Sequence, residues 1–226
     1  MHPLDNPIWH ALNGPHAGFA TRHGPARRYP PDVAFFAAVD DLDADARTAL
    51  AELAAEQLVV IARAGIGALD GELGEAMRMT GHQYVLADDV SLPVPPAGVD
   101  IEPLGVDDVA GMLDLVRATE PGPFLHRTIE LGDYYGVRDG DRLVAMAGER
   151  CHLEGWCEIS AVCTHPDAQR RGLGAALTAV VAAGIRARGE TPFLHVVEGN
   201  AGARRLYERM GFRRRAGMEL VALRPR

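Results

Sequence analysis

Residues 169–175 have the composition of an anion-binding turn. They read QRRGLGA, and a run of small apolar residues follows them. The first N–H groups of a helix have no partner inside it, and the helix dipole adds roughly half a positive charge at that end. Gly172 and Gly174 lack the Cβ atoms that would hold a phosphate away from the backbone, and Arg170 and Arg171 can add charge-assisted hydrogen bonds. The segment therefore predicts a site for a pyrophosphate-bearing ligand.

A packing role for the same glycines is the alternative. The spacing is neither GxGxxG nor that of a nucleotide-hydrolysing P-loop, and short glycine motifs often occur without a ligand. A glycine pair that only lets a helix approach a sheet closely would produce the same pattern. The elements around the turn are needed to decide between the two interpretations.

The turn stands between a predicted strand and a predicted helix. In residues 157–164, CEISAVCT, side chains alternate between the two faces of a strand. From Leu173 to Ile185 apolar residues recur every three or four positions, as on one face of a helix, and Gly189 is a typical helix stop. Asn200 is a suitable N-cap for a further helix. The other elements expected in this half are a strand at 98–104, a helix at 106–118, a hairpin at 133–150 that turns at Asp139-Gly140, a strand at 192–197, a helix at 201–210 and two last strands at 212–215 and 218–223.

The first 95 residues indicate a smaller and less regular unit. Residues 91–98, SLPVPPAG, resist both helix and sheet and are the best candidate for a linker. The sequence thus predicts a mixed α/β protein in two parts, residues 1–95 and 96–226. The elements expected in the first part are a loop-rich stretch at 10–32, a helix at 43–57, a short buried strand at 58–62 and an apolar segment at 83–87.

The composition argues against several classes of function. A net charge of −8 at pH 7 argues against a nucleic-acid partner, and no apolar run is long enough to cross a membrane. The N-terminal MHPLDNPIWH lacks the basic and apolar regions of a secretory signal, so we expect a cytoplasmic protein. The chain has no lysine, which excludes Schiff-base chemistry on that side chain. Cys151, Cys157 and Cys163 form no CxxC pair, so we expect reduced thiols and no metal site.

The order of these motifs resembles the GNAT superfamily of N-acetyltransferases, over roughly residues 99–223. QRRGLG resembles that superfamily's acyl-CoA pyrophosphate loop, and NAGARRLYERMGF resembles its second signature. EISAVCTHPD before the loop and PFLHV after it resemble a subgroup that joins a degenerate N-terminal half to a complete C-terminal acetyltransferase domain. The resemblance implies a GNAT fold with a mixed sheet in the second half, and a smaller, degenerate GNAT-like α/β unit in the first half that could cover the acceptor site.

The resemblance also implies acetyl-CoA as co-substrate, no metal, and direct attack by an amine in a ternary complex. Backbone groups of Val162, Cys163 and Thr164 would hold the pantetheine arm and the thioester, with one N–H polarising the carbonyl. Asn200 and Ala203 would line the far side of the cofactor. The residues implied at the pyrophosphate are Gln169, Arg170, Arg171, Gly172, Leu173, Gly174 and Ala175.

Two side chains are implied as the acid and the base. Tyr207 matches the superfamily's tyrosine near the sulfur, where it would contact the cofactor and protonate the departing thiolate. A core tyrosine is the alternative, because Tyr207 lies on an apolar helix face. Glu158 is the candidate base, acting directly or through water, and a glutamate paired with an arginine is the alternative. Ser160 shares the face of Glu158 in a regular strand, and a bulge, which this superfamily often has here, would reverse that.

Several further residues are interpreted as structural. His165 and His195 flank the site, and each is expected to be held by hydrogen bonds, while Cys163 is expected to be a packed thiol and not an acetylated nucleophile. Residues 62–71, ARAGIGALDG, imitate the loop but lack its arginine pair and its long apolar helix. Three histidines of the first half match no metal-ligand spacing: His10, His16 and His23.

We therefore expect an acetyl-CoA-dependent N-acetyltransferase whose acceptor is a small-molecule or peptide amine. The alternative is a CoA-binding or CoA-sensing module with this fold and no transfer activity. A third option retains the enzyme and changes the donor to a longer acyl-CoA. We expect no nucleic-acid or membrane partner, and the sequence leaves the oligomeric state open, a homodimer included.

Overall fold

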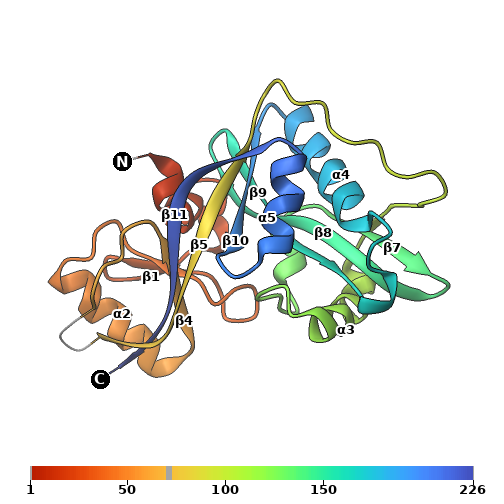
Figure 1. Ribbon diagram of the computed structural model, residues 1–226. Helices are drawn as coiled ribbons and strands as arrows, with labels where there is room; N and C mark the ends of the chain where they lie inside the picture. Colours follow the sequence, from red (N-terminus) through yellow and green to blue (C-terminus); the bar gives the residue numbers. More distant parts are fainter. Residues whose placement is uncertain (1, 70–72, 226) are drawn as a thin grey trace.

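The computed structural model describes residues 2–69 and 73–225 (Figure 1). Its main feature is a mixed sheet of eight described strands in the order β4-β11-β5-β10-β9-β8-β7-β6. A small sheet of three strands, β1-β2-β3, lies in the first part of the chain. The strands are β1 Thr21–His23, β2 Ala26–Arg28, β3 Ala37–Ala38, β4 Val59–Arg63, β5 Leu73–Leu86, β6 Glu102–Leu104, β7 Tyr134–Asp139, β8 Arg142–Leu153, β9 Trp156–Thr164, β10 Thr191–Val197 and β11 Phe212–Pro225. The helices are α1 Pro7–Leu12, α2 Ala44–Glu56, α3 Val109–Thr119, α4 Leu173–Ala187 and α5 Ala201–Arg209.

The elements predicted around the glycine turn are confirmed. Gly172 is the N-cap of α4 in the left-handed conformation (φ 77°), and Gly189, with φ 79°, follows the end of that helix. Asn200 caps α5, because its Oδ1 accepts a hydrogen bond from the N–H of Ala203 at 3.0 Å. The hairpin of β7 and β8 turns at Gly140, whose φ of 60° suits a tight turn. The predicted mixed α/β class is therefore the observed one.

Two strands are much longer than the sequence pattern indicates. The apolar segment at 83–87 is only the end of β5, and the two strands expected after α5 form one strand, β11, with a register shift between Arg214 and Ala216. Residues 75–80 of β5 are mostly partly or fully exposed. Hydrophobic alternation therefore cannot identify this part of the strand, which is held by its ladder of backbone bonds with β11.

The stretch at 10–32, expected to be loop-rich, also contains regular structure. Helix α1 begins before it and ends at Leu12, and strands β1 and β2 pair antiparallel within it. Elements of three to six residues are too short to display a period, so the pattern did not predict them. Residues 91–98 form no helix or strand, as their prolines predict, and their role as a linker between two parts stays a prediction.

Strand β5 joins the two predicted parts of the chain. It lies between β10 and β11 and pairs antiparallel with both (Figure 1, yellow between two blue strands). On β10, Phe193 faces a core shared with the first part, and Leu194 and Val196 face the core under α4. The division at residue 96 and the degenerate-copy interpretation of the first part stay predictions, but both parts contribute strands to one sheet. In the described residues, no helix combines the length and apolar character needed to cross a membrane.

We predict that residues 96–226 expressed alone will aggregate or fail to unfold cooperatively. Without β5, the inner edges of β10 and β11 would expose unpaired N–H and C=O groups. Size-exclusion chromatography and urea unfolding followed by circular dichroism would measure this. Co-expression with residues 1–95 is the matched control and should restore a folded complex. A monomeric, cooperatively folded 96–226 fragment would contradict the prediction.

Candidate active site

The candidate site forms where β9 and β10 separate. These two strands run parallel but pair only from Thr191 with Trp156 to Phe193 with Glu158. Further along, β9 carries a bulge at Ala161, whose φ is 53°, because Gly148 pairs with Ser160 and Met146 with Cys163. A cavity of about 580 Å³ opens between the diverging strands. Backbone that would otherwise continue the sheet is thus free to meet a ligand.

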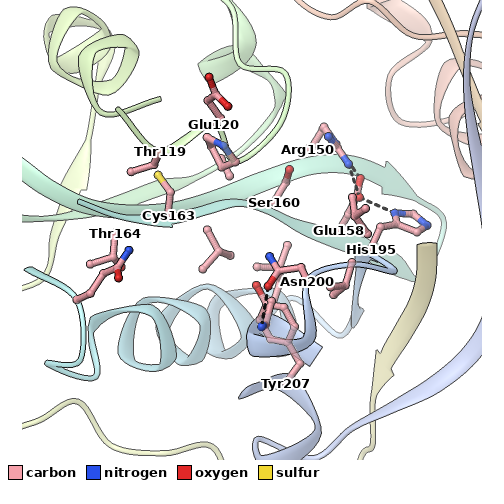
Figure 2. A pocket seen from close by; sticks show the side chains of 18 of the residues that line it. Thr119, Glu120, Arg150, Glu158, Ser160, Cys163, Thr164, His195, Asn200 and Tyr207 are labelled. Atoms are coloured by element: carbon pink, nitrogen blue, oxygen red, sulfur yellow. Dashed lines mark hydrogen bonds and ion pairs between the residues drawn. The ribbon is translucent and has the colours of Figure 1, made fainter. Parts of the chain in front are cut away.

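Most of the predicted site residues lie at this cavity. Those that line it are Glu158, Val162, Cys163, Thr164, Gln169, Asn200, Ala203 and Tyr207 (Figure 2). The rest of the predicted pyrophosphate set continues from Gln169 through the turn into the first turn of α4. Leu173 is buried in the core, so only its backbone N–H is available to a ligand. Ser160 also lines the cavity together with Glu158, because the bulge begins only after it.

The turn before α4 offers a series of N–H groups. Ala176 is the first residue of the helix whose N–H has a backbone partner, the carbonyl of Gly172. The N–H groups of residues 170–175 have no hydrogen-bond acceptor within the described parts of the chain. Arg170 and Gly172 both have left-handed backbone, and Arg170 makes no ion pair with a described residue, whereas Nη1 of Arg171 lies 3.7 Å from Asp139. This arrangement fits a pyrophosphate, since it combines free N–H groups, a helix N-terminus and an unpaired guanidinium.

Two buried acids near the bulge retain their protons. Burial raises the pKa of the Tyr207 hydroxyl well above its ordinary value, and the nearby Cys163 adds to that shift. Burial likewise raises the pKa of the Cys163 thiol to about 11. The ring of Tyr207 packs edge-on against Phe212, with 5.7 Å between ring centroids. At neutral pH the site therefore holds a phenol that can donate a proton and a thiol that is a poor nucleophile.

Glu158 is the centre of a buried ion pair. Its two oxygens accept hydrogen bonds from Nε (3.0 Å) and Nη2 (2.6 Å) of Arg150, and Oε1 also lies 2.7 Å from Nδ1 of His195 (Figure 2). Burial opposes the charge of this carboxylate, but the attraction of Arg150 and the hydrogen bond from His195 lower its pKa to about 2. The paired-glutamate alternative therefore matches the geometry, and the role of Glu158 as a base stays a prediction.

A chain of polar contacts connects His195 to the first part of the protein. Nη1 of Arg215 donates to Oε1 of Gln83 at 2.8 Å, which leaves the Gln83 amide nitrogen to donate to the Leu4 carbonyl and to Nε2 of His195 at 2.9 Å. Because Nε2 of His195 must then accept, Nδ1 carries the ring proton and donates it to Glu158. Arg215 is itself paired with Asp5 at 2.6 Å. The network defines one orientation for Glu158 and His195.

Sequence reasoning missed three polar residues of the cavity: Thr119, Glu120 and Arg150. Glu120 is the C-cap of α3 and has left-handed backbone, with φ 46°. Arg150 faces Glu158 because it shares a β8 bulge with Cys151, between the pairs Glu149 with Ile159 and His152 with Cys157. The available signal was the charged pair Glu149-Arg150, which directly follows the apolar, buried residues 143–148 of β8.

A second polar cluster lies away from the cavity lining. The ligand-type atoms of Glu149, His152 and Cys157 lie within 4.8 Å of one another, close enough for one metal ion. Glu149 also accepts a hydrogen bond from Nη2 of Arg188 at 2.7 Å, and burial raises the pKa of Cys157. Hydrogen bonds and ion pairs thus account for the positions of Glu149, His152 and Cys157. The expectation that the protein binds no metal stays a prediction.

The remaining side chains from the sequence analysis have local partners or lie elsewhere. Nδ1 of His165 accepts a hydrogen bond from the Asp167 N–H at 3.2 Å. His16 is bonded to the Tyr29 hydroxyl at 2.8 Å, and burial lowers its pKa to about 4. His23 is paired with Glu52. In the imitation loop at 62–71, residues 70 and 71 lie outside the described residues.

Comparisons with known proteins agree with the fold. Residues 134–221 match the model of the FR47-like protein family. A protein from Novosphingobium aromaticivorans, described as a member of the GNAT family, is 37% identical over the whole of both chains, with a TM-score of 0.90. A GCN5-related N-acetyltransferase from Kribbella flavida is 20% identical, covers 90% of this chain and 88% of its own, and has a TM-score of 0.65. A Drosophila protein is 18% identical, with 88% and 73% covered and a TM-score of 0.66. The last two show the fold alone, and no curated protein matches the chain.

We predict that Arg150→Met will lower the free energy of unfolding at pH 7 by about 3–5 kcal/mol, because it leaves the Glu158 carboxylate buried without a counter-ion. Since the folded-state pKa of Glu158 is depressed, the pair stabilises the protein above pH 4.5 and loses its effect as pH falls toward about 2. The difference between the variant and the natural chain should therefore be smaller at pH 4 than at pH 7.

Urea unfolding at both pH values would measure this difference. The double variant Arg150→Met, Glu158→Leu is the control and should recover most of the lost stability, because no charge is left unpaired. Equal losses in the single and double variants would contradict the ion-pair account.

Proposed function

Because this chain belongs to the GNAT superfamily of acetyltransferases, we propose that it transfers the acetyl group of acetyl-CoA to a primary amine by direct attack in a ternary complex. The observation that carries the proposal is the cavity between the diverging β9 and β10. It adjoins the free N–H groups of residues 170–175 and contains the protonated hydroxyl of Tyr207. The transfer needs a site for the anionic part of the cofactor, backbone groups that hold the thioester, and a donor that protonates the departing sulfur.

In this proposal the co-substrate lies along β9. Backbone groups of Val162, Cys163 and Thr164 hold the pantetheine arm and the thioester, and an N–H at the bulge polarises the thioester carbonyl. The pyrophosphate binds the turn at 169–175. Gly174 suits this position, because a Cβ there would point into the space between Val162, Thr164 and Leu206, 3.8–4.0 Å from each. Asn200 and Ala203 line the other side of the arm.

The amine nitrogen attacks the thioester carbon, so that a C–N bond forms and the C–S bond breaks. The departing sulfur needs a proton, and the Tyr207 hydroxyl, kept protonated by burial, supplies it. The amine must lose a proton, and Glu158 is the candidate acceptor of that proton through water. Its low pKa makes Glu158 a weak base. This favours a different role for it, which is to orient Arg150 and His195.

A covalent route through Cys163 is less well supported. The thiol has a pKa of about 11, so little thiolate is present at neutral pH. The side chain is also buried, at 7% exposure, and belongs to the core under α3. Direct attack needs no thiolate and uses the same cavity.

We predict that Gly172→Glu will weaken acetyl-CoA binding at least about tenfold, because it puts a carboxylate and a strained backbone where the pyrophosphate binds. Isothermal titration with acetyl-CoA measures the effect. Gly189→Glu is the matched control, since Gly189 has nearly the same φ, has open surroundings and lies at the opposite end of α4. Equal affinities for the two variants would contradict the loop assignment.

We predict that Tyr207→Phe will lower kcat about 100-fold or more, with acetyl-CoA affinity nearly unchanged, because only the proton donor is lost. Thiol release with an accepted amine measures turnover. Tyr135→Phe is the control, because Tyr135 lies outside the cavity lining. Unchanged turnover would assign Tyr207 to the core alone, and tight acetyl-CoA binding without turnover on any amine would favour a CoA-sensing module.

A further inference from the structure

The Arg150 guanidinium lines the cavity and has a free edge, formed by Nη1 and the second Nη2 proton, to which no described residue is bonded. Glu158 takes up Nε and one Nη2 proton, and the ring of Phe36 lies 5.1 Å from the guanidinium carbon. Nη1 makes no hydrogen bond to a described residue, yet it is not among the fully buried polar atoms that lack a partner. The Arg150 side chain keeps 16% of its surface exposed, and it lines this cavity as well as a smaller one beside Phe36. Two or three N–H donors are thus available to a ligand.

This edge is held in one position. The ion pair with Glu158 is supported by His195, Gln83 and Arg215, so the guanidinium cannot turn away without breaking a buried contact. Phe36 belongs to the first part of the chain, so this part packs directly against the Arg150 guanidinium. A fixed, planar fork of donors is suited to a carboxylate, whose two oxygens match its spacing.

The charges of the cavity suit a ligand with both signs. The charged side chains of its described lining are Arg150, Glu158 and Glu120, with His195 beside them. Arg150 and Glu158 neutralise each other, and the exposed Glu120 remains as an attractive partner for an approaching ammonium group. Figure 2 shows Glu120 and Arg150 on one side of β9 and Asn200 and Tyr207, the cofactor side, on the other in this view.

The spacing also limits the size of the acceptor. Glu158 and Ser160 are two residues apart on one strand face, which corresponds to about 7 Å. The bulge, where the thioester is placed in the proposed function, begins directly after Ser160. An acceptor held by Arg150 beside Glu158 can therefore reach the reacting carbon only if a few bonds separate its amine from its anchored group.

We propose that the acceptor is a small amino acid, bound by its carboxylate to the free edge of Arg150, with its amine directed to the bulge in β9. This inference rests on the proposed function, because it names the acceptor of the same transfer. An amide or ester of the same molecule keeps the amine but lacks the charge that Arg150 recognises.

Equilibrium binding tests this directly. The protein saturated with CoA is titrated with a panel of α-amino acids and short ω-amino acids, and with the amide of each. We expect at least one acid to bind about tenfold or more tightly than its amide, since a charge-assisted hydrogen bond is lost. The variant Arg150→Gln, Glu158→Gln keeps a neutral hydrogen-bonded pair, and its acid-to-amide affinity ratio should fall to about one.

The binding and turnover measurements distinguish a failure of this inference from a failure of the proposed function. If acids and amides bind equally, or if no member of the panel binds, the carboxylate inference is overturned. Thiol release from acetyl-CoA with amines that lack a carboxylate would then show that acetyl transfer stands without it. A double variant that retains the preference for acids would also overturn the assignment to Arg150, provided that its urea unfolding shows a folded protein.

Discussion

The separation of β9 from β10 after three residue pairs is the constraint on which the rest of the site depends. Parallel strands in a continuous sheet satisfy one another's N–H and C=O groups, and a ligand then has no access to them. Here the pairing stops at Glu158 and Phe193, and the bulge at Ala161 turns β9 away. The cavity, the exposed strand backbone and the approach of α5 with Tyr207 all follow from this separation.

The local backbone is strained at the same place. In the described part of the chain, three residues other than glycine have left-handed backbone, namely Glu120, Ala161 and Arg170. Each such conformation costs roughly 1–3 kcal/mol, so surrounding packing must maintain it. Glu120 and Ala161 line the cavity, and Arg170 directly follows the lining residue Gln169. Strain that gathers around one cavity, and not at scattered turns, supports a ligand-binding role for the site.

The first part of the chain supports the site in two ways. Its strand β5 lies between β10 and β11, which fixes the side of the cavity opposite β9. Gln83 is hydrogen-bonded to His195 and Phe36 packs against Arg150, while Asp5 holds Arg215, which in turn donates to Gln83. Buried charges are tolerated only when paired and hydrogen-bonded, so this polar network requires both parts of the protein. The shared sheet and the site therefore depend on the same set of contacts between the two parts.

The sequence by itself determined those features that depend on neighbours along the chain. The N-cap Asn200, the turn at Gly140, the apolar face of α4 and the glycine-rich turn before α4 each depend on residues within a few positions. Only the tertiary structure decided the features that depend on distant residues. Residues 75–80 of β5 are partly or fully exposed and have no apolar pattern, so the sequence could not predict that they pair with β11. Arg150 meets Glu158 through a bulge in β8, and Glu158 meets His195 across the gap between two strands. Whether Glu158 titrates freely or is held as an ion is set by these contacts, because a pKa depends on the charges and burial around a group and not on its place in the chain.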